Sequence, residues 1–401
     1  MPQSVQYLKF GEFFSGPGGL ALGAILAESK NGERVLKIKH AWSNDYDPSS
    51  CETYKKNICK NEKNPQVICR DVRDLDIDTL SSIDIFAYGF PCNDFSVVGE
   101  QKGFNGKFGP LYSYGINVLN KFKPRVFVAE NVGGIASAND GRVFIKILDD
   151  LARAGNGYKI TAHLYKAEDY GVSQTRHRYI IVGIDQSIGV EFKVPKPTHK
   201  GNYVPVKVVL SNIPENAFNN EHAKVASQVV ERLKHTKPGE NAWTANLPAH
   251  LKLNVKTARM SQIYKRLHPD LPSYTITGSG GGGTHGYHYA EPRPLTNRER
   301  ARIQSFPDDF EFVGSKEKVR KQIGMAVPPM LSNVVFKAIL DTLNNVEYPY
   351  VEANYQIVPK TNLLLFEYEQ NCRSKNHISE TQRLGERGRD YCEEGRVGAR
   401  I

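Results

Sequence analysis

Residues 83–90, IDIFAYGF, form an apolar run that decides the fold class. Such a short run, rich in branched and aromatic residues, is typical of a buried strand, and YSYGINVLNKF at 112–122 follows it with helical periodicity. The same order recurs in YLKFGEFF (7–14) with LALGAILAE (20–28), KIKHAWSN (37–44) with SSCETYKKN (49–57), and RVFVAEN (125–131) with VFIKILDDLARA (143–154). Alternating strands and helices favour a parallel sheet covered on both faces. The sequence therefore predicts an α/β fold.

This alternation ends after two further strands, which we expect within residues 158–184. Prolines at 195 and 197 interrupt it, and scattered basic residues with one glycine-rich run, TGSGGGGTHGYHY (277–289), follow. Helical periodicity then returns in VPPMLSNVVFKAILDTLNN (327–345), which we expect to pack back on the sheet. The predicted divisions are a first domain at 1–197, a smaller second domain at 198–320, a returning helix at 321–345 and a partly disordered extension at 346–401.

Composition narrows the function classes. The 401-residue chain carries a formal net charge of +10, which favours a polyanionic partner such as nucleic acid. Its six cysteines show neither CxxC pairs nor zinc-type alternation with histidine, so neither a disulfide framework nor a structural metal is expected. No run approaches the roughly 20 apolar residues of a membrane helix, and the first residues lack signal-peptide character, so a cytoplasmic protein is expected.

A glycine-rich turn connects the first strand to its helix in FFSGPGGLALGA (13–24). Open α/β sheets bind nucleotide-like ligands at this position, although the glycine spacing is not GxGxxG and a tight connection would also explain it. Asp45, near the end of the second strand, is placed to accept hydrogen bonds from ribose hydroxyls, and the Tyr46 ring to stack on adenine. Asp71, after the next expected strand, is placed to bind an adenine amino group.

A cysteine follows the central strand in GFPCNDFS (89–96). Cys92 stands just beyond the carboxyl end of that strand, where open α/β sheets place their ligands. A buried structural cysteine is the alternative, because free cysteines are among the most buried residues. The following NDFSVVGEQKGFNGKFG (93–109) lacks apolar periodicity and is punctuated by glycine, which favours a nucleophile under a mobile lid.

Charged side chains fall at the same edge of the predicted sheet. Glu130 follows the apolar run RVFVA, where a carboxylate is costly unless it has a partner or a function. Arg176 and Arg178 are two residues apart in QTRHR and therefore share one face of an extended segment. Either arginine alone would pass for a surface residue. Together with Cys92, these residues form a candidate site of thiol, carboxyl and guanidinium.

Six motifs in order resemble those of the DNA (cytosine-5) methyltransferases, specifically the bacterial modification enzymes of restriction-modification systems. They are FFSGPGG (13–19), GFPCNDFS (89–96), ENV (130–132), QTRHR (174–178), RPLTNRERARIQSFPDDF (293–310) and GMAVPP (324–329), so the resemblance spans about residues 8 to 340. Each motif alone is weak, but six in the right order and spacing are specific. The resemblance implies a Rossmann-like methyltransferase domain with a mixed, mostly parallel sheet and a smaller target-recognition domain.

The resemblance also implies a mechanism. Cys92 matches the thiolate that attacks C6 of cytosine, and Glu130 matches the carboxyl that hydrogen-bonds or protonates the ring near N3. Arg178 matches the arginine that holds the cytosine carbonyl, and Arg176 its neighbour that steadies the backbone or the catalytic carboxylate. The target cytosine is flipped out of the duplex into the pocket.

The cofactor implied is S-adenosyl-L-methionine, with no metal, because the sulfonium already activates the methyl group. Its matching residues are Phe14, Gly16, Gly18, Asp45, Tyr46, Asp71, Val72 and Leu111. The partner implied is double-stranded DNA, bound by a monomer that protects it from a cognate restriction endonuclease. The arginines of 293–302 are expected first to organise the second domain and only second to contact phosphate.

Two positions depart from the family pattern. Asn93 stands where glutamine is usual, which shortens a contact expected to touch DNA, and Met325 replaces an asparagine, which removes an amide hydrogen bond. Neither change removes a group that the mechanism requires. The alternatives are an RNA cytosine-5 methyltransferase, a sequence-specific DNA-binding protein that has lost catalysis and, more distantly, a nicotinamide-dependent oxidoreductase.

Overall fold

Strands and helices alternate through the first half of the chain in the computed structural model, which describes residues 4–90, 111–254, 260–278 and 283–359. The strands are β1 (Ser4–Phe13), β2 (Glu28–Asn31), β3 (Arg34–Asp45), β4 (Val67–Cys69), β5 (Ile85–Gly89), β6 (Val126–Val132), β7 (Tyr158–Lys166), β8 (His177–Asp185), β9 (Val194–Pro195), β10 (Tyr350–Val351) and β11 (Tyr355–Ile357). The α-helices are α1 (Gly19–Leu26), α2 (Pro48–Ile58), α3 (Leu111–Phe122), α4 (Arg142–Arg153), α5 (Val206–Val209), α6 (Ser227–Lys234), α7 (Asn297–Ile303), α8 (Lys316–Met325) and α9 (Pro329–Leu343).

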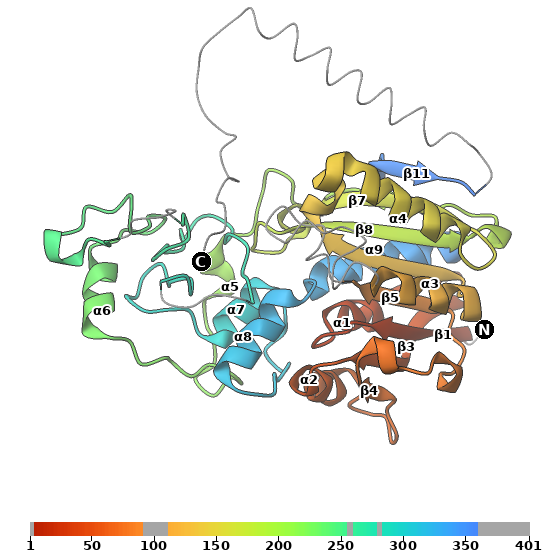
Figure 1. Cartoon of the computed structure of the whole chain (residues 1–401), viewed down its shortest axis with the longest axis horizontal. Coiled ribbons are helices and arrows are strands. Elements are labelled where there is room, and N and C mark those ends of the chain that lie inside the picture. The colour runs from red at the N-terminus through yellow and green to blue at the C-terminus, as the bar shows by residue number, and fades with distance from the viewer. Residues whose placement is uncertain (1–3, 91–110, 255–259, 279–282, 360–401) are drawn as a thin grey trace, which may run out of the picture.

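A mixed sheet lies at the centre of the first half of the chain, with strand order β11-β7-β8-β6-β5-β1-β3-β2 and with β4 paired to β3 (Figure 1). The neighbours β1 and β3, β1 and β5, β3 and β4, and β5 and β6 are parallel. In contrast, β2, β8 and β11 run antiparallel to their neighbours. The predicted α/β fold with a mixed, mostly parallel sheet is therefore confirmed.

The central strand β5 shows why both faces of the sheet are covered. Ile85 and Ala87 point to one face and Phe86 and Tyr88 to the other, and all are fully buried. The first face packs against α1 and α9, where the rings of Phe10 and Phe336 meet edge to face at 5.7 Å. The second face packs against α3 and α4. Burying each large apolar side chain stabilises the fold by about 1.5–3 kcal/mol, so these two layers hold the sheet edge in place.

The returning helix predicted at 321–345 is two helices, because Pro328 and Pro329 end α8 and begin α9. Helix α9 lies close against α1, where the Ser332 hydroxyl donates to the carbonyl of Leu20 at 2.7 Å. By length and composition alone, α8 and α9 taken together (Lys316–Leu343) would pass for a membrane-spanning segment, but 72% of the most apolar window is buried in the protein. This burial is the pattern of core helices.

The described residues between 198 and 315 contain little regular structure and lie beside the sheet as a separate lobe (Figure 1). Their apolar clusters are small, and buried arginines join the loops instead. Arg298, at 0% exposure, donates to the carbonyls of Phe218, Pro307 and Phe310 at 2.6–2.8 Å. Arg266 donates to the carbonyls of Leu233, Thr236, His288 and Tyr289 at 2.6–3.0 Å. Each guanidinium thus donates to several backbone carbonyls, which in a sheet would accept hydrogen bonds from a neighbouring strand.

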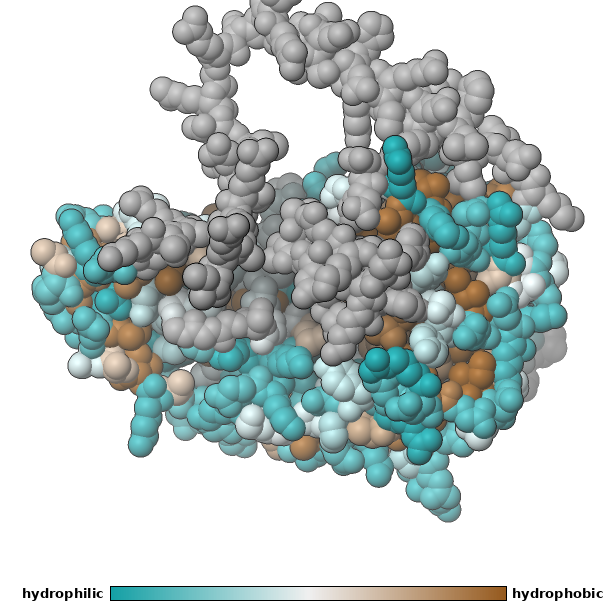
Figure 2. Space-filling model, viewed as in Figure 1, coloured by the Kyte–Doolittle hydropathy of each residue, from teal (hydrophilic) through white to brown (hydrophobic). Residues whose placement is uncertain are grey.

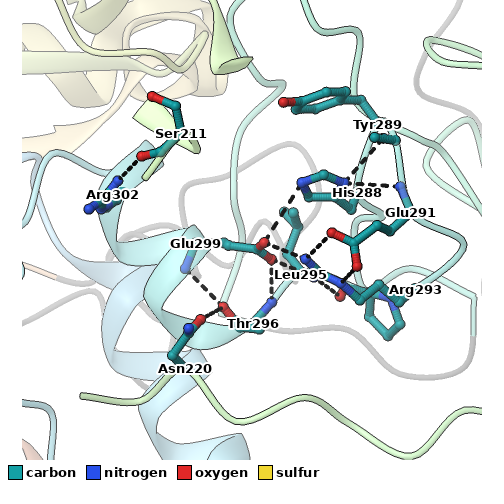
Figure 3. A network of polar contacts seen from close by, with 12 residues as sticks. Ser211, Asn220, His288, Tyr289, Glu291, Arg293, Leu295, Thr296, Glu299 and Arg302 are labelled. Atoms are coloured by element: carbon teal, nitrogen blue, oxygen red, sulfur yellow. Dashed lines mark hydrogen bonds and ion pairs between the residues drawn. The ribbon is translucent and has the colours of Figure 1, made fainter. Parts of the chain in front are cut away.

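A polar network at the start of α7 continues this arrangement (Figure 3). Arg293 pairs with Glu291 at 2.8 Å and with Glu299 at 2.8 Å. The Thr296 side chain and Glu299 form a reciprocal capping box at the first turn of the helix. Arg302 binds the Asp308 carboxylate at 2.5 Å. These arginines therefore have protein partners, as expected of residues that organise the second lobe.

Residues 350–357, which fall in the predicted extension, add two strands to the first half of the chain. β11 pairs with β7 at the sheet edge, and the Asn354 side-chain oxygen accepts a hydrogen bond from the amide of Leu164 at 2.7 Å. On the face shown in Figure 2, hydrophilic residues cover much of the described surface and hydrophobic ones form separate groups.

Candidate active site

A cavity of about 630 Å³ lies at the carboxyl ends of β1, β3, β5 and β6. Open α/β sheets bind their ligands at this edge, because the loops that follow parallel strands meet there. The predicted site residues that line it are Phe14, Tyr46, Asp71, Val72, Leu111, Glu130, Arg176 and Arg178. The cavity therefore brings together the residues predicted for cofactor binding and those predicted for catalysis.

The predicted nucleophile Cys92, like Asn93, lies outside the described residues. Phe90, two positions before Cys92, is described and lines the cavity. The Asn131 side chain on β6 donates to the Phe90 carbonyl at 3.1 Å. The chain therefore leaves β5 at the cavity wall, beside the carboxyl end of β6.

Glu130 and Arg178 form an ion pair in the cavity, with 2.9 Å between Arg178 Nε and Glu130 Oε1. Neighbouring antiparallel strands β6 and β8 carry them, and only 13% of the Glu130 side chain is exposed. Burial raises the pKa of Glu130, although Arg178 and Arg176 oppose this shift. Gly89 makes room for the carboxylate, because a Cβ there would lie 3.0 Å from Glu130 Oε2. A carboxyl with a raised pKa beside a guanidinium is suited to proton donation.

Arg176 is 1% exposed and joins the two lobes at the cavity wall. Its guanidinium donates to the carbonyl of Ile276, in the second lobe, at 3.3 Å and to that of Gly324, in α8, at 3.0 Å. At Gly324 a Cβ would lie 2.0 Å from the backbone nitrogen of Gly278, so the two segments cross without room for a side chain. Arg176 therefore positions the cavity wall by holding backbone.

The glycine turn after β1 is held by Asp45. The backbone N–H of Gly16 donates to Asp45 Oδ2 at 2.8 Å, and that of Asp47 donates to Oδ1 at 2.9 Å. Burial raises the pKa of Asp45, and these hydrogen bonds partly offset the shift. Gly18 has a left-handed φ of 96°, and a Cβ there would lie 2.8 Å from the Ile58 side chain. Gly16, Gly18 and Asp45 thus shape the turn next to the cavity rather than line it.

Phe14 holds a strained backbone conformation at the cavity wall. Its φ of 53° lies in the left-handed region, which is uncommon for an aromatic residue and concentrates at functional sites. The next residue, Ser15, fixes this conformation by donating its backbone N–H to the Asn44 carbonyl at 3.1 Å. The ring therefore has a defined place beside the turn.

The opposite wall fits an adenosine-like ligand. Tyr46 is 60% exposed, so its ring is free to stack on a base, and Val72 and Leu111 supply apolar surface. Asp71 pairs with Arg73 at 2.6 Å, and this pairing lowers the pKa of Asp71 to about 2, so the carboxylate stays ionised. An aromatic face, apolar walls and an ionised acceptor match the cofactor that the motifs imply.

Further cavity residues were not among the predicted site residues. Arg70 and Arg73 line the cavity on either side of Asp71 in the sequence. Their place beside Asp71 in RDVRDL (70–75) is the sequence feature that could have identified them. Asn44 lines the same wall and donates to the carbonyls of Ile68 and Arg70 at 3.0 and 2.8 Å, which holds β4 in place. Met325 also lines the cavity and is 63% exposed, so a thioether stands where the family pattern has an amide.

Folding also brings together a histidine, a cysteine and a glutamate whose spacing gave no sequence signal. His40 Nδ1 lies 3.5 Å from Cys59 Sγ and 3.0 Å from each carboxylate oxygen of Glu62. Burial raises the pKa of the Cys59 thiol to about 12, so the thiol stays protonated in the metal-free protein. The group is a hydrogen-bond cluster in which His40 and Cys59 are buried and Glu62 is exposed.

Comparison with known proteins agrees with this geometry. Residues 8–341 match the family model of the C-5 cytosine-specific DNA methylases. The chain is 56% identical over 352 residues to the Type II methyltransferase M.BbvI of Brevibacillus brevis, covering 86% of this chain and 94% of that protein. It is 39% identical over 360 residues to M.NgoFVII of Neisseria gonorrhoeae, covering 88% and 91%.

Among solved structures, the fold is similar to that of an Escherichia coli protein described as a prophage-encoded DNA modification methyltransferase. The TM-score is 0.64 at 23% identity, with 84% of this chain and 99% of that chain covered. This likeness confirms the methyltransferase fold.

The chain belongs to the C-5 cytosine-specific DNA methylase family. It is therefore an enzyme of the DNA (cytosine-5-)-methyltransferase class, as the motifs predicted. Membership of the family implies S-adenosylmethionine as methyl donor and DNA as substrate.

Proposed function

We propose that this enzyme methylates C5 of one cytosine within a specific duplex DNA sequence, through a covalent bond between Cys92 and C6 of the base. The buried Glu130–Arg178 pair carries the proposal, because it supplies a proton donor and a cation in a cavity that Phe90, two positions before Cys92 in the sequence, also lines. Similarity to Type II methyltransferases supports membership of a restriction-modification system.

In the proposed reaction, the Cys92 thiolate forms a bond to C6 while Glu130 donates its proton to N3, so no negative charge accumulates on the ring. The electron pair of the resulting enamine makes C5 nucleophilic, so that C5 would take the methyl group from bound S-adenosylmethionine and release S-adenosylhomocysteine. Transfer of the C5 proton to water then forms the C5–C6 double bond and expels the thiolate from C6, and N3 returns its proton to Glu130. Arg178 holds the base carbonyl and keeps Glu130 oriented throughout.

The depth of the pair requires base flipping in this proposal. Glu130 and Arg178 lie on sheet strands, with only 13% and 14% of their side chains exposed. A cytosine stacked within a duplex cannot bring N3 to such a buried carboxyl, so it must leave the helix at a cost of a few kcal/mol. The net charge of +10 favours DNA binding in general, which offsets part of this cost.

Asp45→Ala is expected to weaken binding of S-adenosylmethionine by at least about tenfold, which corresponds to about 1.4 kcal/mol. The carboxylate holds the amides of Gly16 and Asp47, so its loss frees the turn that shapes the cofactor side of the cavity. Isothermal titration calorimetry with the purified protein measures the change in Kd. Asp149→Ala, on the outer helix α4, is the matched control, and equal Kd values for the two variants would contradict the role of Asp45.

Expression in a bacterial host without cytosine methylation tests the whole proposal. We expect bisulfite sequencing of the host DNA to show methylated cytosine at one position of one short sequence, and the DNA to resist a restriction enzyme that cuts there. Host DNA without 5-methylcytosine, combined with methylation of transfer RNA by the purified protein, would instead support an RNA methyltransferase.

A further inference from the structure

A second cavity, of about 340 Å³, lies in the second lobe between α7, α8 and residues 221–229. We call it the cationic cavity, after the side chains of Lys224, His285, Arg300, Lys316 and Arg320 that line it. The carboxylates that line it are those of Glu221 and Glu317. Basic groups therefore outnumber acidic ones on its walls.

The two guanidinium groups of this cavity lack the carboxylate partners that the neighbouring arginines have. In the described parts of the chain, no salt bridge joins a carboxylate to Arg300 or Arg320, and the Nε of each has no hydrogen-bond partner. Arg300 is 4% exposed, and its Nη2 donates to the Leu295 carbonyl at 3.2 Å. Burial lowers the pKa of Arg300 to about 10, and Arg320 adds to this effect. A buried cation without a counter-charge is costly unless an anion arrives to neutralise it.

His285 adds a neutral donor to this wall. Arg320 Nη1 donates to His285 Nδ1 at 2.7 Å, and because a guanidinium has no acceptor, Nδ1 must be unprotonated. The remaining proton of the neutral ring is then on Nε2. Burial, together with Arg320 and Arg300, lowers the pKa of His285, which keeps the ring neutral. Arginine and histidine donors that form no salt bridge with the nearby carboxylates are suited to phosphate oxygens.

The place of the cavity in the chain indicates the source of that phosphate. Every residue that lines it falls within 198–320, the part of the chain that the motifs predict to be the target-recognition domain. Val225, Val229 and Leu295 supply an apolar wall that suits the deoxyribose next to a phosphate. We propose that the cationic cavity binds one backbone phosphodiester group of the duplex DNA substrate. This inference rests on the proposed function and deepens it.

Arg320→Gln tests the site, because Arg320 is half-buried and its side chain forms no salt bridge that the structure describes. The affinity for a duplex carrying the methylated sequence is measured at several KCl concentrations. We expect affinity to fall about tenfold at low salt, and the slope of log K against log salt to shrink by about one. Arg320→Lys keeps the charge and is expected to retain most of the slope. Arg153→Gln makes the same change in net charge on α4, where the Arg153 side chain is 73% exposed, and this variant should retain the full wild-type slope.

A slope for Arg320→Gln equal to that of Arg153→Gln would overturn the assignment. Thermal shift with inorganic phosphate separates the two sources of phosphate. Stabilisation of the wild type but not of Arg320→Gln, with an unchanged DNA slope, would show a site for free phosphate and would also overturn it. Wild-type protein that neither binds nor methylates any duplex would contradict the proposed function, whereas methylation with an unchanged slope would contradict only the phosphodiester site.

Discussion

Cys92→Ala is expected to reduce methyl transfer by about 10⁴-fold or more, while binding of S-adenosylmethionine stays within about twofold of the wild type. Without the thiolate no bond forms at C6, and C5 of cytosine is too poor a nucleophile to take the methyl group. The cofactor side should be unaffected, because Tyr46, Asp71 and the Asp45-held turn belong to other strands. Transfer of tritiated methyl groups to duplex DNA measures the rate, and calorimetry measures cofactor binding.

A duplex with 5-fluorocytosine at the target position provides the complementary result. The wild type should become covalently attached to it in the presence of S-adenosylmethionine, because fluorine cannot leave C5 as the proton does. Cys92→Ala, and wild type mixed with an unfluorinated duplex, are the controls. Full methyl transfer by Cys92→Ala, or an adduct formed by that variant, would exclude this cysteine as the nucleophile.

Glu130→Gln is expected to lower the rate of methyl transfer by about 10²- to 10⁴-fold without unfolding the protein. The amide oxygen of glutamine still accepts from Arg178, whose Nε lies 2.9 Å from Glu130 Oε1, so the cavity keeps its shape. The variant cannot deliver a full proton to N3, however. Single-turnover methylation measures the rate, and circular dichroism of Glu130→Gln and Cys92→Ala in parallel reports folding.

The pH profile distinguishes a proton donor from a merely structural carboxyl. Burial raises the pKa of Glu130, so the protonated, active form is present below the raised value and is lost as the pH rises through it. The wild-type rate should therefore show a falling limb on the alkaline side that Glu130→Gln lacks. Identical profiles for the two proteins would contradict proton donation by Glu130.

Much of this fold follows from local sequence pattern. The alternation of apolar strands with amphipathic helices predicted the strands from β1 to β8 except the short β2, because such periodicity depends on neighbouring residues alone. The glycine turn, Glu130 and the QTRHR arginines could be placed at one sheet edge for the same reason, since the carboxyl ends of parallel strands meet there. The roles of these residues, and the domain boundaries, stay predictions.

Contacts between distant segments could not be read in this way. Asp45 was predicted as a cofactor-binding residue, and nothing in its sequence position indicated that its carboxylate also accepts from the amides of Gly16 and Asp47. Arg176 was expected to steady the backbone or the catalytic carboxylate, but the sequence did not identify the carbonyls of Ile276 and Gly324, 100 and 148 residues away, as its partners. Arg298, Arg300 and Arg302 stand close together in one motif, but they have different hydrogen-bond and ion-pair partners. Tertiary structure, not the motif, determines those partners. Motif letters identify such residues but not the atoms they touch.

The crossing of Gly278 and Gly324 bears on engineering chimeras with new specificity. Residues 273–276 are tied to the first half of the chain, because the amide of Thr175 donates to Ser273 at 2.7 Å and that of Ile276 to the Gln174 side chain at 3.0 Å. A second lobe grafted with a junction before residue 273 would replace one side of this crossing, which has no room for even a methyl group at Gly324. A junction after Gly278 would leave the host crossing whole and exchange only what lies beyond it.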